Sequence, residues 1–109
     1  MPSKRERSEI RSIRPRHAPV VEITGEGSAT YIWFNRTGKH ARTIEISKWP
    51  VLLVDLDARG EVIGVETAGF REFTINAVLK KAGLKAPADL LKRTRYVHAV
   101  SAEAASAAV

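Results

Sequence analysis

An acidic pattern in the middle of the chain is the arrangement most able to do chemistry. Counting Asp55 as position 1, Asp57 falls at position 3, Gly60 at 6 and Glu66 at 12, which is the spacing of a calcium-binding EF-hand loop. Position 5 is Arg59, whose positive charge stands where an oxygen ligand belongs, and β-branched runs flank the loop where an EF-hand has helices. We therefore expect a charged hairpin turn here and no calcium site.

The same carboxylates are the candidates for general acid–base catalysis. Asp55 and Asp57 fall on one face at the end of a predicted strand, next to Arg59, and Glu66 lies on the following strand. Structural ion pairs also cluster carboxylates, so a solvated turn neutralised by Arg59 is the favoured interpretation. No Gly-x-Ser-x-Gly elbow or glycine-rich phosphate loop is present. We predict no catalytic residues and no enzyme, with acid chemistry at Asp55, Asp57 or Glu66 as the weakest alternative.

Metal and cofactor chemistry find little support in the residue types. The three histidines, His17, His40 and His98, lack the spacing of metal ligands. The chain contains no cysteine, which excludes a thiolate metal site, a disulfide framework and a cysteine nucleophile. The prediction is no metal and no cofactor.

A basic cluster lies beside aromatic residues in the first half of the chain. Its members are Arg36, Lys39, His40 and Arg42, and the aromatic residues are Tyr31 and Trp33. Basic groups next to aromatic rings can hold single-stranded nucleic acid by charge and stacking. A solvated hairpin tip above core aromatics explains the same pattern, so both interpretations stay open.

The positive charge is concentrated at the N-terminus. The formal net charge is +6, and residues 1–17 hold six basic against two acidic residues. The remaining residues hold 12 basic against 10 acidic ones and are nearly neutral. Residues 1–17 carry too few apolar side chains to build a core, so we predict a disordered basic arm there. A single domain over residues 18–100 and an Ala/Ser-rich tail over residues 101–109 follow.

Five short apolar segments separated by turn-forming residues indicate β-strands. They cover residues 20–24, 30–34, 41–46, 51–56 and 61–67. Tight turns at residues 36–39 and 57–60 favour hairpins and an antiparallel meander. Gly64, inside the last segment, suggests a bulge or a large side chain packed across it. Trp49, beside Pro50, is interpreted as a cap on the core.

The pattern then changes to a helical period. Ile75, Val78, Leu79 and Ala82 fall at i, i+3, i+4 and i+7, with Thr74 as N-cap and Gly83 as the C-terminal stop. A second short helix is expected over residues 86–93, and residues 96–100 fit either a last strand or an extended segment. The predicted fold class is α+β: an antiparallel β-meander of four to five strands followed by two short α-helices.

Residues 54–66, which read Val-Asp-Leu-Asp-Ala-Arg-Gly-Glu-Val-Ile-Gly-Val-Glu, resemble an uncharacterised family of small bacterial proteins, domain of unknown function 2283. Residues 29–32 and 42–46 resemble that family's first two strands, so the likeness covers about residues 29–69. The resemblance implies a small β-rich fold and no known activity.

Two predicted strands are apolar on both faces, which points to a second covering layer. In one of them Ile32 and Phe34 oppose Tyr31 and Trp33. Two short helices cover one sheet face, so we expect a second subunit on the other, with Trp33 and then Tyr31 as contacts. The prediction is a non-enzymatic, cytoplasmic interaction module that forms a homodimer. The alternative is a nucleic-acid-binding protein that uses the basic arm and residues 36–42. No membrane partner is expected, because no apolar stretch reaches the roughly 20 residues that span a bilayer.

Overall fold

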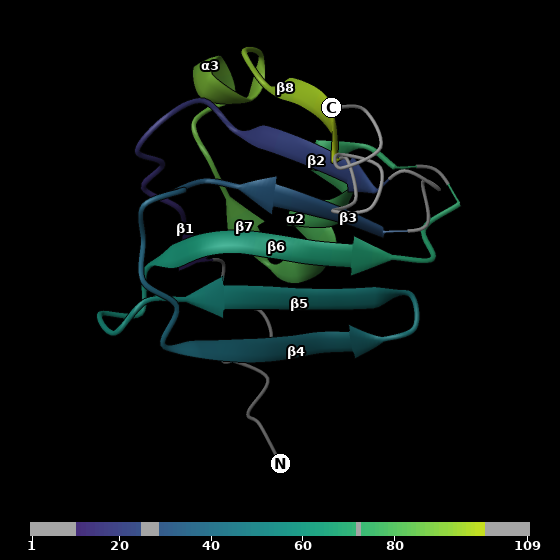
Figure 1. Ribbon diagram of the computed structural model, residues 1–109, viewed down its shortest axis with the longest axis horizontal. Helices are drawn as coiled ribbons and strands as arrows, with labels where there is room; N and C mark the ends of the chain where they lie inside the picture. The colour runs from purple at the N-terminus through teal and green to yellow at the C-terminus, as the bar shows by residue number, and fades with distance from the viewer. Residues whose placement is uncertain (1–10, 25–28, 72, 100–109) are drawn as a thin grey trace, which may run out of the picture.

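A six-stranded β-sheet with a helical layer against one face organises the chain (Figure 1). The computed structural model describes residues 11–24, 29–71 and 73–99. The strands of the sheet are β2 (Val20–Thr24), β3 (Ala29–Trp33), β4 (Arg42–Lys48), β5 (Val51–Leu56), β6 (Val62–Ala68) and β8 (Arg95–Ala99). The other elements are β1 (Arg11–Ser12), β7 (Leu84–Lys85), α2 (Ile75–Ala82) and α3 (Ala88–Leu91). The α+β class is therefore confirmed.

The strands lie in the order β4-β5-β6-β3-β2-β8. β4, β5 and β6 form an antiparallel meander, and β3 extends it by pairing antiparallel with β6 and with β2. β8 completes the sheet by pairing parallel with β2, so the last strand-like segment of the sequence is a strand. The five sequence-predicted strands all exist, with ends shifted by at most two residues.

The hairpin predicted at residues 36–39 is wrong, because β3 and β4 are not neighbours. The N–H groups of Phe34 and Asn35 both donate to the carbonyl of Ile63, at 2.9 and 3.0 Å, which holds the end of β3 on β6. The following residues carry the chain to the far edge of the sheet, where β4 begins (Figure 1). β3 is apolar on both faces and suits the centre, whereas β4 has charged residues at both ends and a bulge, which suit an edge.

The predicted disordered arm over residues 1–17 includes residues that belong to the folded domain. Arg11 and Ser12 form β1, which pairs parallel with β7, and Ile13 is buried in the core at 4% exposure. The Ile13 side chain and two backbone hydrogen bonds hold this segment against β7. The N–H of Arg11 donates to the carbonyl of Gly83, and the N–H of Ile13 donates to the carbonyl of Lys85. Residues 1–10 and the predicted tail over residues 101–109 lie outside the described residues.

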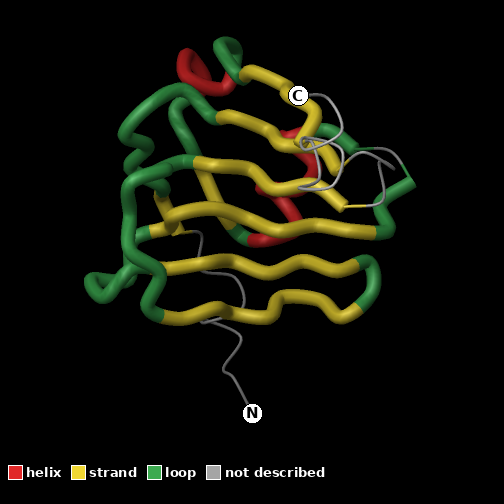
Figure 2. The backbone as a smooth tube through the Cα atoms, viewed as in Figure 1, coloured by secondary structure: helices red, strands yellow, loops and turns green. Residues whose placement is uncertain are grey.

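The core lies between the sheet and α2, which is seen behind the strands (Figure 2). Alternate residues of β5, Leu52, Val54 and Leu56, are 0 to 2% exposed because they point toward the helical layer. α2 follows its predicted bounds: the Thr74 hydroxyl accepts from Ala77 N at 3.1 Å, and Gly83 ends the helix at φ 71°. Neither helix of the described part is long and apolar enough to cross a membrane.

Candidate functional site

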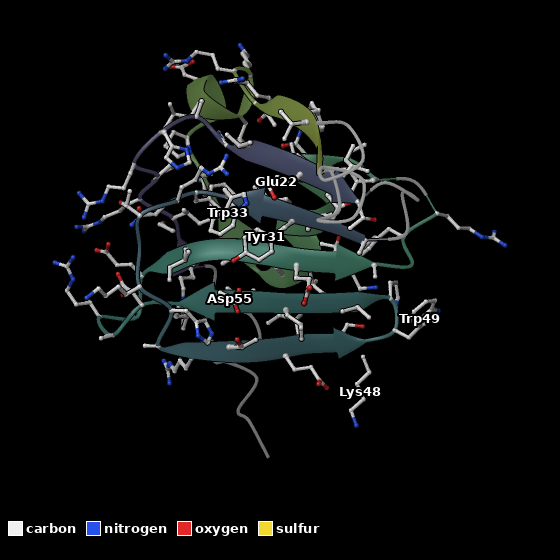
Figure 3. All side chains as sticks on the ribbon, in the orientation of Figure 1. Glu22, Tyr31, Trp33, Lys48, Trp49 and Asp55 are labelled. Carbon is white, nitrogen blue, oxygen red and sulfur yellow. The ribbon has the colours of Figure 1, made fainter. Side chains whose placement is uncertain are left out.

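The sheet face opposite α2, called the open face below, carries the aromatic residues that the sequence singled out (Figure 3). Strand register aligns Val20, Trp33, Gly64, Asp55 and Thr43 in one row across five strands. A second row holds Glu22, Tyr31, Glu66, Leu53 and Glu45. No helix of the described residues lies over these rows (Figure 1).

Gly64 lets the Tyr31 ring lie flat across the open face. A Cβ at Gly64 would stand 2.3 Å from Tyr31 Cε1 and 2.5 Å from the hydroxyl oxygen. The ring thereby reaches over β6 to β5, where its hydroxyl donates to Asp55 Oδ2 at 2.7 Å. Both predictions for Gly64 are confirmed, since the β5–β6 pairing also shifts register next to it. Burial raises the pKa of the Tyr31 hydroxyl above its ordinary value, and the hydrogen bond to Asp55 raises this pKa further.

Asp55 is the centre of a hydrogen-bond network on this face. In addition to the Tyr31 bond, its Oδ1 accepts from the Thr43 hydroxyl at 2.6 Å. His40 Nε2 lies 2.8 Å from the same hydroxyl and 3.5 Å from Asp55 Oδ1. Because Thr43 gives its proton to Asp55, His40 Nε2 is the donor to Thr43 and not a base for it. The network holds the side chains of Tyr31, Thr43 and His40 around Asp55.

Trp33 packs between an aromatic and a cationic side chain. Its ring centroid lies 4.5 Å from that of Tyr31 with a 51° interplanar angle, and the Arg36 guanidinium lies 5.5 Å from the indole centroid. Arg36 also forms an ion pair with Glu22 at 3.0 Å. The indole Nε1 is buried and finds no hydrogen-bond partner among the described residues.

The four predicted nucleic-acid contacts are all exposed, and their side chains have different surroundings. Arg36 is held by Glu22 and Trp33, and His40 by Thr43 and Asp55. Arg42 begins the edge strand β4. Lys39 instead lines a pocket with Arg16 and Arg59, two residues that the sequence did not connect to it. Arg16 lies 23 residues before Lys39 and Arg59 lies 20 residues after it, so no local pattern in the sequence connects the three.

The carboxylates of the EF-hand-like pattern are held apart. Asp57 sits in the β5–β6 turn, where its Oδ1 accepts from the N–H groups of Arg59 and Glu61 at 2.8 and 2.9 Å. The hydrogen bond from the Glu61 N–H is the main cause of the lowered pKa of Asp57. Asp55 and Glu66 lie in different rows of the open face. No group of three potential metal ligands comes together among the described residues, which exclude the His98 side chain.

Trp49 was expected to cap the core, and this prediction is wrong. Trp49 lies in the β4–β5 turn (Figure 3), and the residue is 74% exposed. A Cβ at Gly69 would come within 2.8 Å of its ring, so the indole lies against the backbone at the end of β6. Trp49 therefore adds an exposed aromatic side chain at the end of the sheet opposite the Lys39 pocket.

In comparison with known proteins, no family model, curated protein or solved structure matches the chain. The resemblance of residues 29–69 to domain of unknown function 2283 stays a prediction.

Proposed function

We propose that this protein is a non-enzymatic interaction module that forms a two-fold homodimer through its open face. The observation that carries this proposal is the asymmetry of the sheet. One face is covered by α2, whereas the other presents the partly exposed side chains of Tyr31, Trp33, Val51 and Leu53. Contiguous apolar side chains left uncovered on a sheet face can mark an interaction site.

The size of the open face supports a second copy as its occupant. Six strands of five to seven residues, spaced about 4.8 Å apart, give a flat area of about 500 Å², to which side-chain relief adds. Specific interfaces bury about 800 Å² per partner, with weaker ones below that value. The face is therefore large enough for a dimer of modest affinity, and two-fold dimers are the commonest soluble oligomers.

The charges of the open face disfavour nucleic acid as its partner. Glu22, Glu45, Asp55 and Glu66 all lie on it, and the carboxylates repel a phosphate backbone. Arg36 is already matched by Glu22. The alternative function, nucleic-acid binding through the basic arm and residues 36–42, therefore has less support. A bacterial, cytoplasmic setting stays a prediction.

A charged substitution in the middle of the open face tests the proposal. Leu53 pairs across the strands with Glu45 on one side and Glu66 on the other, so Leu53→Lys places a cation between two carboxylates. The monomer keeps its fold, while a second copy would have to bury the new charge. The matched control is Ala77→Lys, at an exposed position of α2.

Light scattering after size exclusion at micromolar concentration gives the readout. We expect the wild type and Ala77→Lys at twice the 12.0 kDa chain mass and Leu53→Lys as a monomer, all with the same far-ultraviolet circular dichroism. A wild type that elutes as a folded monomer contradicts the proposal, and so does a Leu53→Lys variant that stays dimeric.

A further inference from the structure

Three separate segments meet in a pocket at one end of the sheet. Arg16 lies before β2, Lys39 lies in the β3–β4 connection, and Arg59 lies in the β5–β6 turn. All three segments lie at the same end of the sheet, on the left in Figure 1. Together with Asn35, Thr37 and Asp57 they line a pocket of about 490 Å³.

The pocket has an excess of positive charge. Its lining holds three basic side chains and one carboxylate, that of Asp57. Oδ1 of this carboxylate already accepts two backbone N–H groups, so Asp57 acts as part of the turn. Within the described residues neither Lys39 nor Arg59 forms an ion pair, and Arg16 makes only a 4.0 Å contact with Glu61 at the exposed rim.

Neutral donors complete the lining. Asn35 uses its side-chain oxygen to accept from both the N–H and the hydroxyl of Thr37, at 3.2 and 3.1 Å. Its amide NH₂ group therefore keeps its two donor hydrogens for another partner. A cavity with cationic and neutral donors converging from three segments matches the chemistry of an oxyanion with several acceptor oxygens.

We infer that this pocket binds the phosphate group of a phosphorylated ligand. Arg and Lys are the side chains that recognise phosphate, Arg through its planar fork and Lys as a point charge. A volume of about 490 Å³ exceeds that of a phosphate ion and lies in the range of small-molecule sites, about 300–1,000 Å³, so a group attached to the phosphate also fits. No aromatic side chain of the described residues lines the pocket, which removes base stacking as a source of affinity and favours a sugar phosphate.

This inference is independent of the proposed dimer. The pocket is formed by loops at the end of the sheet, and neither Tyr31, Trp33 nor Leu53 lines it. A chain that fails to dimerise can therefore still bind phosphate, and a chain that fails to bind phosphate can still dimerise.

The test compares two double variants with the same charge change. Lys39→Gln/Arg59→Gln removes two pocket cations, and Lys48→Gln/Arg71→Gln removes two exposed cations at the opposite end of the sheet, where Figure 3 labels Lys48. All four side chains are exposed, so both variants are expected to fold. The probes are inorganic phosphate, ribose 5-phosphate and an oligothymidylate of ten nucleotides. Each is titrated into the full chain, and binding is measured by nuclear magnetic resonance from the shifts of the Gly38 and Ala58 amide signals.

We expect saturable shifts of these two amides with inorganic phosphate and tighter binding of ribose 5-phosphate. The pocket variant should raise the dissociation constant at least tenfold and the control variant less than twofold. The oligonucleotide could bind in place of ribose 5-phosphate, with binding lost only in the pocket variant. That result would support the pocket as a phosphate site and identify a nucleic acid backbone as the source of the phosphate. Absence of saturable shifts with every probe, or equal weakening in the two variants, overturns the inference.

Discussion

Replacing Gly64 by alanine should destabilise the protein because the Tyr31 ring occupies the place of the new methyl group. The added Cβ would stand 2.3 to 2.6 Å from three atoms of Tyr31, which no real contact tolerates. The Tyr31 side chain can rotate, so the change that costs least free energy is for its ring to move off the open face. It then loses the 2.7 Å hydrogen bond to Asp55, about 1.5 kcal/mol for a charged acceptor in a half-buried site, and its contact with Trp33, about 1 kcal/mol.

The expected loss in the free energy of unfolding for Gly64→Ala is about 2 kcal/mol, after the gain of about 0.5 kcal/mol for alanine over glycine in a strand. Urea denaturation of a double-mutant cycle measures it. In a Tyr31→Ala background, where no ring is displaced, Gly64→Ala should be neutral or slightly stabilising. An equal loss in both backgrounds, or a loss below about 0.5 kcal/mol in the wild type, would refute the reasoning.

Two further predictions concern Tyr31 and the N-terminal segment. Because the pKa of Tyr31 is raised in the folded state, its contribution to stability is complete below the ordinary value of 10.0 and is lost as the pH rises above it, where the unfolded chain ionises first. Stability in urea should therefore fall above pH 10 more steeply for the wild type than for Tyr31→Phe, and parallel pH profiles would contradict this. Ile13→Ala, at a core position 4% exposed, should cost about 3 kcal/mol, whereas the exposed neighbour change Arg14→Ala should cost less than about 0.5 kcal/mol. Equal denaturation midpoints for these two variants would mean that residue 13 is not part of the core.

Local interactions explain the elements that the sequence predicted well. The bounds of α2 follow from the Thr74 cap, the apolar spacing and Gly83, all within a segment of ten residues. The β5–β6 hairpin could be predicted equally well from the sequence. Its Asp57–Gly60 turn is closed by backbone and side-chain hydrogen bonds between residues at most four positions apart. Periodicity likewise identified the two-faced apolar pattern of β3 and β5, because side chains of a strand alternate whatever its neighbours are.

Pairing between distant residues required the tertiary structure. The sequence suggested a large side chain across Gly64, but only the β3–β6 pairing identifies it as Tyr31 and brings its hydroxyl to Asp55. The burial of Ile13 depends on β7, more than 70 residues later, and an isolated isoleucine in a basic segment gives no local sign of it.

The amino-acid sequence by itself determined the α+β class, five of the strands, α2 with its caps and the apolar pattern on both faces of β3 and β5, because each depends on neighbours along the chain. The order of the strands was decided only in the folded molecule, since loop closure costs little more for a distant partner than for a near one and the choice rests on which faces become buried. That choice placed β4 at the edge of the sheet. It also brought Lys39 together with Arg16 and Arg59, and so created the pocket for which the sequence holds no pattern.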